Sequence, residues 1–150
     1  MSSRLYIAGV LVCAAASLSA CDEKLSSIAG PTPNLEPTFT SIQRDIFEAT
    51  DSSGRTSCVT CHTNTGRAPS GGMNLNHDTA YDQLVNVPVR GKPGATRVVP
   101  GDTNSSYLIQ KLTGSPAIVG RRMPNNGPPY LTDGQILIIE RWVALGAPRN

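Results

Sequence analysis

The five residues Cys58-Val59-Thr60-Cys61-His62 constrain the fold of this chain more than any other part of its sequence. In a C-x-x-C-H motif, two thiols two residues apart are followed directly by an imidazole. With this spacing both sulfurs can form thioethers with the two vinyl groups on one edge of a porphyrin, and the histidine then stands beneath the iron as an axial ligand. The motif therefore predicts one covalent haem c, held by Cys58 and Cys61 and ligated by His62.

The other two of the four cysteines lie in an N-terminal segment typical of a bacterial lipoprotein signal. A polar start precedes an apolar run over residues 7–18 and the tetrapeptide Leu18-Ser19-Ala20-Cys21, in which small residues precede a cysteine. The apolar run, about 12 residues long, is too short for a permanent membrane-spanning helix. We expect a signal peptide at residues 1–20 and a lipid anchor on Cys21.

Both signals place the chain in the bacterial cell envelope, because c-type haem is attached outside the cytoplasm and a lipobox implies export. Asp22 follows the acylated position, which favours the periplasmic face of the inner membrane, with the outer membrane as the alternative. An ordinary secretory signal cut at the same small residues is the competing interpretation. All 11 acidic residues and 12 of the 13 basic residues follow Ala20, a difference of +1, which gives no support for nucleic-acid binding.

Two regions are expected after the signal. Residues 21–37 contain serine, glycine and proline without a hydrophobic period, which predicts a flexible tether; packing on the domain surface is the alternative. Residues 38–150 suffice for one small domain with one core. This region has no internal repeat and a single C-x-x-C-H, so we expect one haem in a monomeric domain.

The domain is predicted to be mainly α-helical, with about four short helices between loops rich in glycine and proline. The first is expected over residues 40–49, beginning at the capping box Thr40-x-x-Gln43. A short helical turn is expected over residues 78–85. A third helix is expected over residues 103–113, with Asp102 as its N-cap and Gly114 as its stop.

The last helix has the clearest signals. Thr132-x-x-Gln135 forms a second capping box, Asp133 suits the positive end of the helix dipole, and Gly146 ends the helix. Trp142 is interpreted as a core aromatic rather than a cofactor contact. Six apolar side chains are expected to form a broad buried face: Ile136, Ile138, Ile139, Trp142, Val143 and Leu145.

The iron has a second axial position, for which the candidates are Met73, His77 and Met123. Met123 is favoured because it lies in an irregular loop that can fold over the distal haem face, next to a proline. Ligation by His62 and Met123 raises the reduction potential and leaves no site for a substrate. Met73 is read as a hydrophobic cover and His77 as a solvated or capping imidazole, but both remain open alternatives, as does a vacant site.

Residues between Phe39 and Ala147 resemble the monohaem cytochromes c of class I, in particular the short domain named for planctomycetes. The resemblance implies a class I cytochrome c-like fold in which the first and last helices pack together and enclose the haem. It also implies His62 and Met123 as axial ligands. Asn125 departs from the family, which usually has a second proline there. The resemblance rests on these segments in this order: Cys58-Val59-Thr60-Cys61-His62, Gly71-Gly72-Met73-Asn74-Leu75, Val99-Pro100-Gly101-Asp102, Ser106-Tyr107-Leu108, Arg122-Met123-Pro124, Pro128-Pro129-Tyr130-Leu131, Ile139 to Trp142, and Gly146-Ala147.

The predicted function is a lipid-anchored electron carrier, not itself an enzyme, that exchanges single electrons with a redox protein or a respiratory complex. One alternative is a haem enzyme, such as a peroxidase, or a gas sensor with a vacant sixth site. Another is a fixed electron-transfer subunit of a membrane respiratory complex. Five basic residues are candidates for steering an acidic partner, or equally for binding water or the haem propionates: Arg90, Lys92, Arg97, Arg121 and Arg122.

Two further readings of the cysteines are weaker. A zinc site formed by Cys58, Cys61, His62 and His77 is disfavoured because adjacent ligands at 61 and 62 give poor tetrahedral geometry. A thioredoxin-like redox pair is disfavoured because no alternation of strands and helices surrounds the motif.

Overall fold

The computed structural model describes residues 35–150. The signal peptide expected at residues 1–20, Cys21 and most of the expected tether lie outside the described residues. At the end of that tether, Leu35 packs against the core, and the backbone N–H of Glu36 donates to Ser41 Oγ at 3.1 Å. The last residues of the expected tether, from Leu35, are therefore packed on the domain. Within residues 35–150, no helix has the length and apolar character that crossing a bilayer requires.

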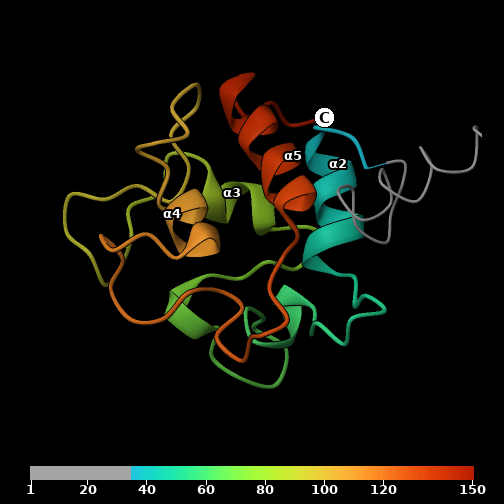
Figure 1. Cartoon of the computed structure of the whole chain (residues 1–150). Helices are drawn as coiled ribbons and strands as arrows, with labels where there is room; N and C mark the ends of the chain where they lie inside the picture. The colour runs from blue at the N-terminus through green and yellow to red at the C-terminus, as the bar shows by residue number, and fades with distance from the viewer. Residues whose placement is uncertain (1–34) are drawn as a thin grey trace, which may run out of the picture.

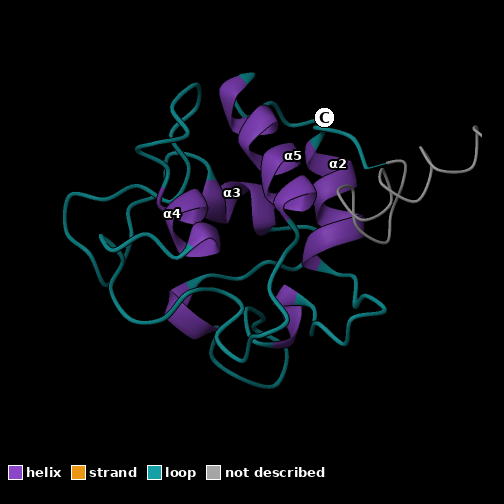
Figure 2. Cartoon of the chain, in the orientation of Figure 1, coloured by secondary structure: helices purple, strands orange, loops and turns teal. Residues whose placement is uncertain are grey.

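Within residues 35–150, four α-helices separated by long loops make up most of the regular structure (Figures 1 and 2). A π-helical turn continues the first helix, two 3₁₀ turns lie in the loops, and residues 35–150 form isolated β-bridges but no strand. This confirms the prediction of a mainly α-helical domain. The helices are α2 (Phe39–Ile42), α3 (Ala80–Leu84), α4 (Tyr107–Thr113) and α5 (Asp133–Ala144), the π-helical turn is Gln43–Phe47, and the 3₁₀ turns are Cys58–Thr60 and Ser70–Gly72.

The first and last helices, α2 and α5, lie side by side and share an aromatic core (Figure 1). The ring centroid of Phe39 is 5.5 Å from that of Trp142 and 5.2 Å from that of Tyr81, which comes from α3. Trp142 is fully buried, and its indole N–H donates to the Pro148 carbonyl at 2.9 Å. The prediction that Trp142 is a core aromatic is confirmed.

The first helix begins at Phe39, one residue earlier than predicted, and its N-cap lies two residues before Thr40. Thr38 is the N-cap, and its hydroxyl accepts a hydrogen bond from the Ser41 N–H at 3.2 Å. The expected partner in the capping box, Gln43, instead donates its side-chain amide to the Leu75 carbonyl at 2.8 Å. The capping box at Thr40 is therefore wrong, because Gln43 is buried and used to hold a distant loop.

The third helix, α4, is shorter than the predicted 103–113. The Asp102 carboxylate accepts from the Ser105 N–H at 2.9 Å, which closes a turn rather than a helix. The N-cap is Ser106, whose fully buried hydroxyl donates to the Asp102 carbonyl at 2.7 Å. The predicted stop is confirmed, since Gly114 caps α4 in the left-handed region with φ 76°.

Helix α5 has the predicted capping box. The Gln135 N–H donates to the Thr132 hydroxyl at 3.2 Å, and the Thr132 N–H donates to the Gln135 side-chain oxygen at 3.0 Å. Its buried face is narrower than predicted, because the helix ends at Ala144 and Leu145 is 67 % exposed.

Candidate functional site

The cysteine motif lies on the 3₁₀ turn Cys58–Thr60, among the loops below the helices in Figure 2. The N–H groups of Cys61 and His62 both donate to the Cys58 carbonyl, at 3.2 and 2.9 Å. This tight turn places the three residues of the motif on one short segment. Both thiols are free; Cys58 is half-buried and Cys61 is exposed.

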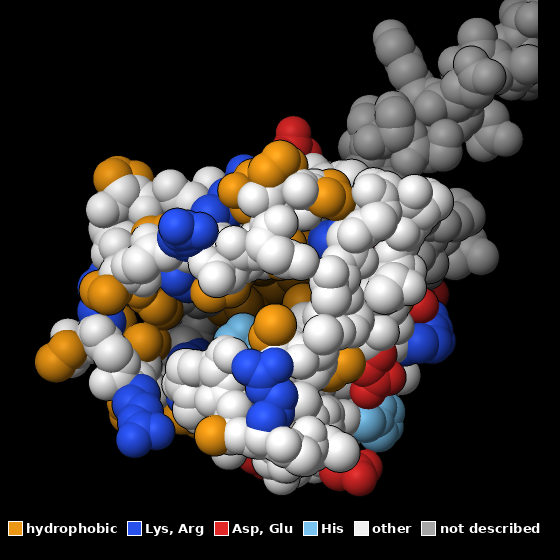
Figure 3. Space-filling model, turned by 90° about the horizontal axis from the view of Figure 1, so that it is seen from below, with side chains coloured by type: hydrophobic (Ala, Val, Ile, Leu, Met, Phe, Trp, Pro, Cys, Tyr) orange, Lys and Arg blue, Asp and Glu red, His pale blue; other side chains and the backbone are white. Residues whose placement is uncertain are grey.

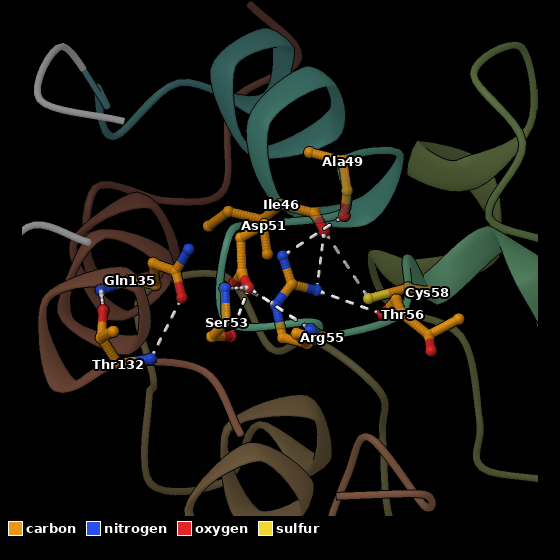
Figure 4. A network of polar contacts seen from close by, with 9 residues as sticks. All are labelled: Ile46, Ala49, Asp51, Ser53, Arg55, Thr56, Cys58, Thr132 and Gln135. Atoms are coloured by element: carbon orange, nitrogen blue, oxygen red, sulfur yellow. Dashed lines mark hydrogen bonds and ion pairs between the residues drawn. The ribbon is translucent and has the colours of Figure 1, made fainter. Parts of the chain in front are cut away.

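The sulfur of Cys58 is directed toward the interior. It lies 3.9 Å from the Ile46 carbonyl oxygen, which also accepts a hydrogen bond from the Arg55 guanidinium at 3.4 Å (Figure 4). Burial raises the pKa of the Cys58 thiol, and the nearby charge of Arg55 only partly opposes this effect. The Cys58 side chain is therefore a neutral thiol at neutral pH, directed into the apolar part of the site.

The His62 ring is oriented by a backbone carbonyl. Its Nδ1 lies 2.9 Å from the Ser70 carbonyl oxygen. Burial lowers the pKa of His62 below its ordinary value, so the ring is neutral near pH 7. Because a carbonyl oxygen can only accept, Nδ1 carries the proton and Nε2 keeps its lone pair. This is the tautomer that a metal ligand requires, with the second ring nitrogen held by a partner.

The loop that follows the motif is tied back to it at three places. The Ser70 N–H donates to the Cys61 carbonyl at 3.0 Å, the Ser70 carbonyl accepts from the His62 ring, and the Leu75 N–H donates to the His62 carbonyl at 2.8 Å. Ser70 was not predicted from the sequence. Its contribution is a main-chain carbonyl, which any residue type supplies, so no sequence signal marked it.

The three candidates for the sixth ligand lie in two kinds of surroundings. Met73 and Met123 are both partly buried and pack against the same hydrophobic core that Cys58 borders. His77 is 70 % exposed in its side chain, with Nδ1 3.7 Å from a Glu48 carboxylate oxygen. Exposure and a surface carboxylate agree with the reading of His77 as a solvated imidazole.

The five basic candidates for partner steering do not share one environment. Arg97 is 8 % exposed and donates to the Gln83 carbonyl at 2.6 Å and to the Gly72 carbonyl at 3.1 Å. Its charge also contributes to the lowered pKa of His62, so it lies near the motif. Arg97 is therefore part of the interior, while Arg90 and Arg121 are exposed.

The residues present fit a covalently attached haem. Two free thiols, one turned inward, stand beside an imidazole that has a free, unprotonated nitrogen and a fixed tautomer. Figure 3 shows a hollow on the loop-rich face with a floor of hydrophobic side chains, and with a histidine and several Lys and Arg side chains around it. An apolar hollow with a histidine and basic side chains around it suits a flat hydrophobic macrocycle with charged edges.

The zinc alternative has no geometric support. Within residues 35–150, no three His, Cys, Asp or Glu side chains are grouped closely enough to hold a metal ion. The same region forms no strand, so it lacks the alternating pattern that a thioredoxin-like pair requires. Two other surface depressions, one beside α5 and Arg122 and one beside α2 and His77, are not lined by the cysteine motif.

No family of known proteins, no curated protein and no solved structure matches this chain. The functional conclusion therefore depends on the motif and on the geometry around it.

Proposed function

We propose that this protein is a monohaem c-type cytochrome of class I type that carries single electrons in the bacterial cell envelope, anchored by lipid on Cys21. The observation that carries the proposal is the arrangement at Cys58, Cys61 and His62, in particular the hydrogen bond from His62 Nδ1 to the Ser70 carbonyl. Two thiols at this spacing next to an imidazole with a free Nε2 match the needs of covalent haem attachment and iron ligation.

Each residue has a defined role in this proposal. Cys58 and Cys61 form the thioethers, His62 supplies the proximal ligand, and Met123 supplies the distal ligand. When bound, the haem supplies reversible one-electron exchange at its iron. The protein keeps the His62 ring in one orientation, surrounds the site with apolar side chains and leaves no vacant position at the iron for a substrate.

Attachment of the haem is tested on the full chain, produced in a host that attaches haem to c-type cytochromes. The intact mass should rise by one haem per chain, and denatured protein in alkaline pyridine should give the spectrum of a haem with both vinyl groups saturated. The double variant Cys58→Ala, Cys61→Ala is the control and should carry no covalent haem. A colourless native protein without added mass contradicts the proposal.

The sixth ligand is tested with carbon monoxide. The ferrous native protein should not bind carbon monoxide at concentrations that saturate Met123→Ala, because the thioether blocks the site. Met73→Leu and His77→Ala are matched controls and should behave like the native protein. Ready binding of carbon monoxide by the native protein would instead favour a haem enzyme or gas sensor with a vacant sixth position. If only His77→Ala gained carbon monoxide binding, the sixth ligand would be His77 rather than Met123.

A further inference from the structure

The segment that carries Met123 has no regular secondary structure, yet one residue of α4, Lys111, makes three hydrogen bonds with it. The Met123 N–H donates to the Lys111 carbonyl at 2.9 Å. The Lys111 ammonium group donates to the Val119 carbonyl at 3.0 Å and also to the Arg121 carbonyl. Lys111 therefore fixes the chain on both sides of residue 122, with its backbone and with its side chain.

Arg122 makes a second attachment to the same helix. Its Nε donates to the Leu112 carbonyl at 2.6 Å, and its guanidinium carbon lies 4.2 Å from the centroid of the Tyr130 ring. The side chain passes directly over Gly114, where a Cβ atom would stand 3.1 Å from Arg122 Cδ. The absence of a side chain at residue 114 leaves room for this arginine.

The cationic side chains of Lys111 and Arg122 donate hydrogen bonds to backbone carbonyls rather than to carboxylates. Within residues 35–150, the ion pairs do not include Lys111 or Arg122. Leu112 lies in the last turn of α4, where helix carbonyls lack intrahelical partners and favour positive charge. The carbonyls of residues 119 and 121 belong to a loop, so they have no helix or sheet N–H as a partner. The Lys111 ammonium group donates to them instead.

We infer that Lys111 and Arg122 are positioning residues, which hold the Met123 segment against α4 so that the thioether stays at the sixth position of the haem. This inference rests on the proposed function. Met123 is partly buried against the core. Its segment is attached to α4 through the carbonyls of residues 119 and 121, the N–H of Met123 and the side chain of Arg122. Removing the side-chain attachments frees the segment, and an added ligand then replaces the thioether more readily.

The test is the affinity of the ferric protein for imidazole, which binds by replacing the Met123 sulfur. Lys111→Met keeps the length of the side chain and removes its donors, so we expect imidazole to bind roughly tenfold more tightly, equivalent to about 1.4 kcal/mol. Arg121→Gln is the matched control. It removes the same charge two residues from Met123, but only its backbone carbonyl, which the substitution retains, takes part in the attachment.

Rescue and a second variant complete the test. Lys111→Arg retains donors and should restore most of the native resistance to imidazole. Arg122→Met removes the other attachment and should weaken methionine ligation in the same direction, which keeps the inference testable if Lys111→Met does not fold. A native methionine-ligated protein whose imidazole affinity is unchanged in both variants, or changes equally in Arg121→Gln, overturns the positioning role. A native protein without haem overturns the proposed function itself.

Discussion

The side chain of Arg55 is fully buried and lies three residues before the first cysteine of the motif. Its Nε is 3.0 Å from an Asp51 carboxylate oxygen, and its other nitrogens donate to the carbonyls of Ile46, Ala49 and Thr56 (Figure 4). A buried guanidinium is stable in the interior only when it is paired with a carboxylate and its N–H groups have hydrogen-bond acceptors. Arg55 thus joins the end of the first helical segment to the turn that carries Cys58.

Breaking this pair should destabilise the protein strongly. In Arg55→Met, the Asp51 carboxylate, whose side chain is 6 % exposed, is left without its cation. The expected loss is about 3–5 kcal/mol in the free energy of unfolding, measured by denaturant titration. Arg44→Met is the control, since Arg44 pairs with Asp45 at the surface, and its effect should be much smaller. Equal effects of the two substitutions would contradict the role assigned to Arg55.

The ion pair of Asp51 with Arg55 also predicts that the free energy of unfolding depends on pH in the acid range. Burial alone would raise the pKa of Asp51, but hydrogen bonds from Ser53 and Arg55 and the charge of Arg55 outweigh it, so the pKa lies below its ordinary value. A carboxyl group with a lowered pKa in the folded state stabilises the protein above its unfolded pKa, about 3.9, and this contribution disappears as the pH falls through the folded pKa.

The free energy of unfolding of the native protein should therefore begin to fall below about pH 5 and should continue to fall as the pH drops through the folded pKa of Asp51. Asp51→Asn should show a shallower fall over that range, because one of the contributing groups is removed. Some dependence should remain, since the pKa of Asp45 is also lowered, chiefly by its hydrogen bond with Arg44. Identical pH profiles for the native protein and Asp51→Asn would show that Asp51 does not contribute.

At the scale of single elements, the two predicted capping boxes had different outcomes although both have the form Thr-x-x-Gln. At α5, Thr132 and Gln135 satisfy each other's N–H groups. At α2, the Gln43 side chain donates to the Leu75 carbonyl, and Thr38 is the N-cap in place of Thr40. The Thr-x-x-Gln pattern forms a capping box when the two side chains have no other hydrogen-bond partner. It does not form one when a distant segment supplies an acceptor to the glutamine.

Thr132→Ala should cost about 1 kcal/mol in the free energy of unfolding, because it leaves the Gln135 N–H without its hydroxyl acceptor. Thr132→Ser keeps the hydroxyl and is the matched control, with a stability close to that of the native protein. Thermal unfolding followed by circular dichroism measures both. A serine variant as unstable as the alanine variant would mean that the methyl group, not the cap, is what matters.

At the scale of the whole molecule, Trp142 connects elements that are far apart in the sequence. It packs against Phe39 of α2 and lies near Tyr81 of α3, with 6.5 Å between the centroids of the Trp142 and Tyr81 rings, and it donates to the Pro148 carbonyl. The Tyr81 hydroxyl in turn donates to the Ala147 carbonyl at 2.8 Å. The C-terminal segment, α5, α2 and α3 are thus joined around one aromatic cluster.

Trp142→Ala should destabilise the protein by about 3–5 kcal/mol, because it leaves a large cavity and an unpaired Pro148 carbonyl. Trp142→Phe retains most of the packing and should cost less. Leu137→Ala on the same helix is the control and should have a small effect, because Leu137 is 42 % exposed. Denaturant unfolding orders the three variants, and a Leu137 effect as large as that of Trp142→Ala would contradict this account of the core.

Sequence alone determined the properties that depend on near neighbours in the chain. The C-x-x-C-H spacing, the stop at Gly114 and the capping box at Thr132 each involve groups within a few residues, so local geometry specifies them. The mainly helical class followed from the same local patterns.

Tertiary structure decided the start of α2, the burial of Arg55 and Arg97, and the attachments of His62 and Met123. These depend on which backbone carbonyls the folded chain brings to each donor; the Leu75 carbonyl reaches Gln43 and the Gly72 carbonyl reaches Arg97 from distant parts of the chain. Every residue carries such a carbonyl, and residue identity therefore does not show which one a buried donor will meet.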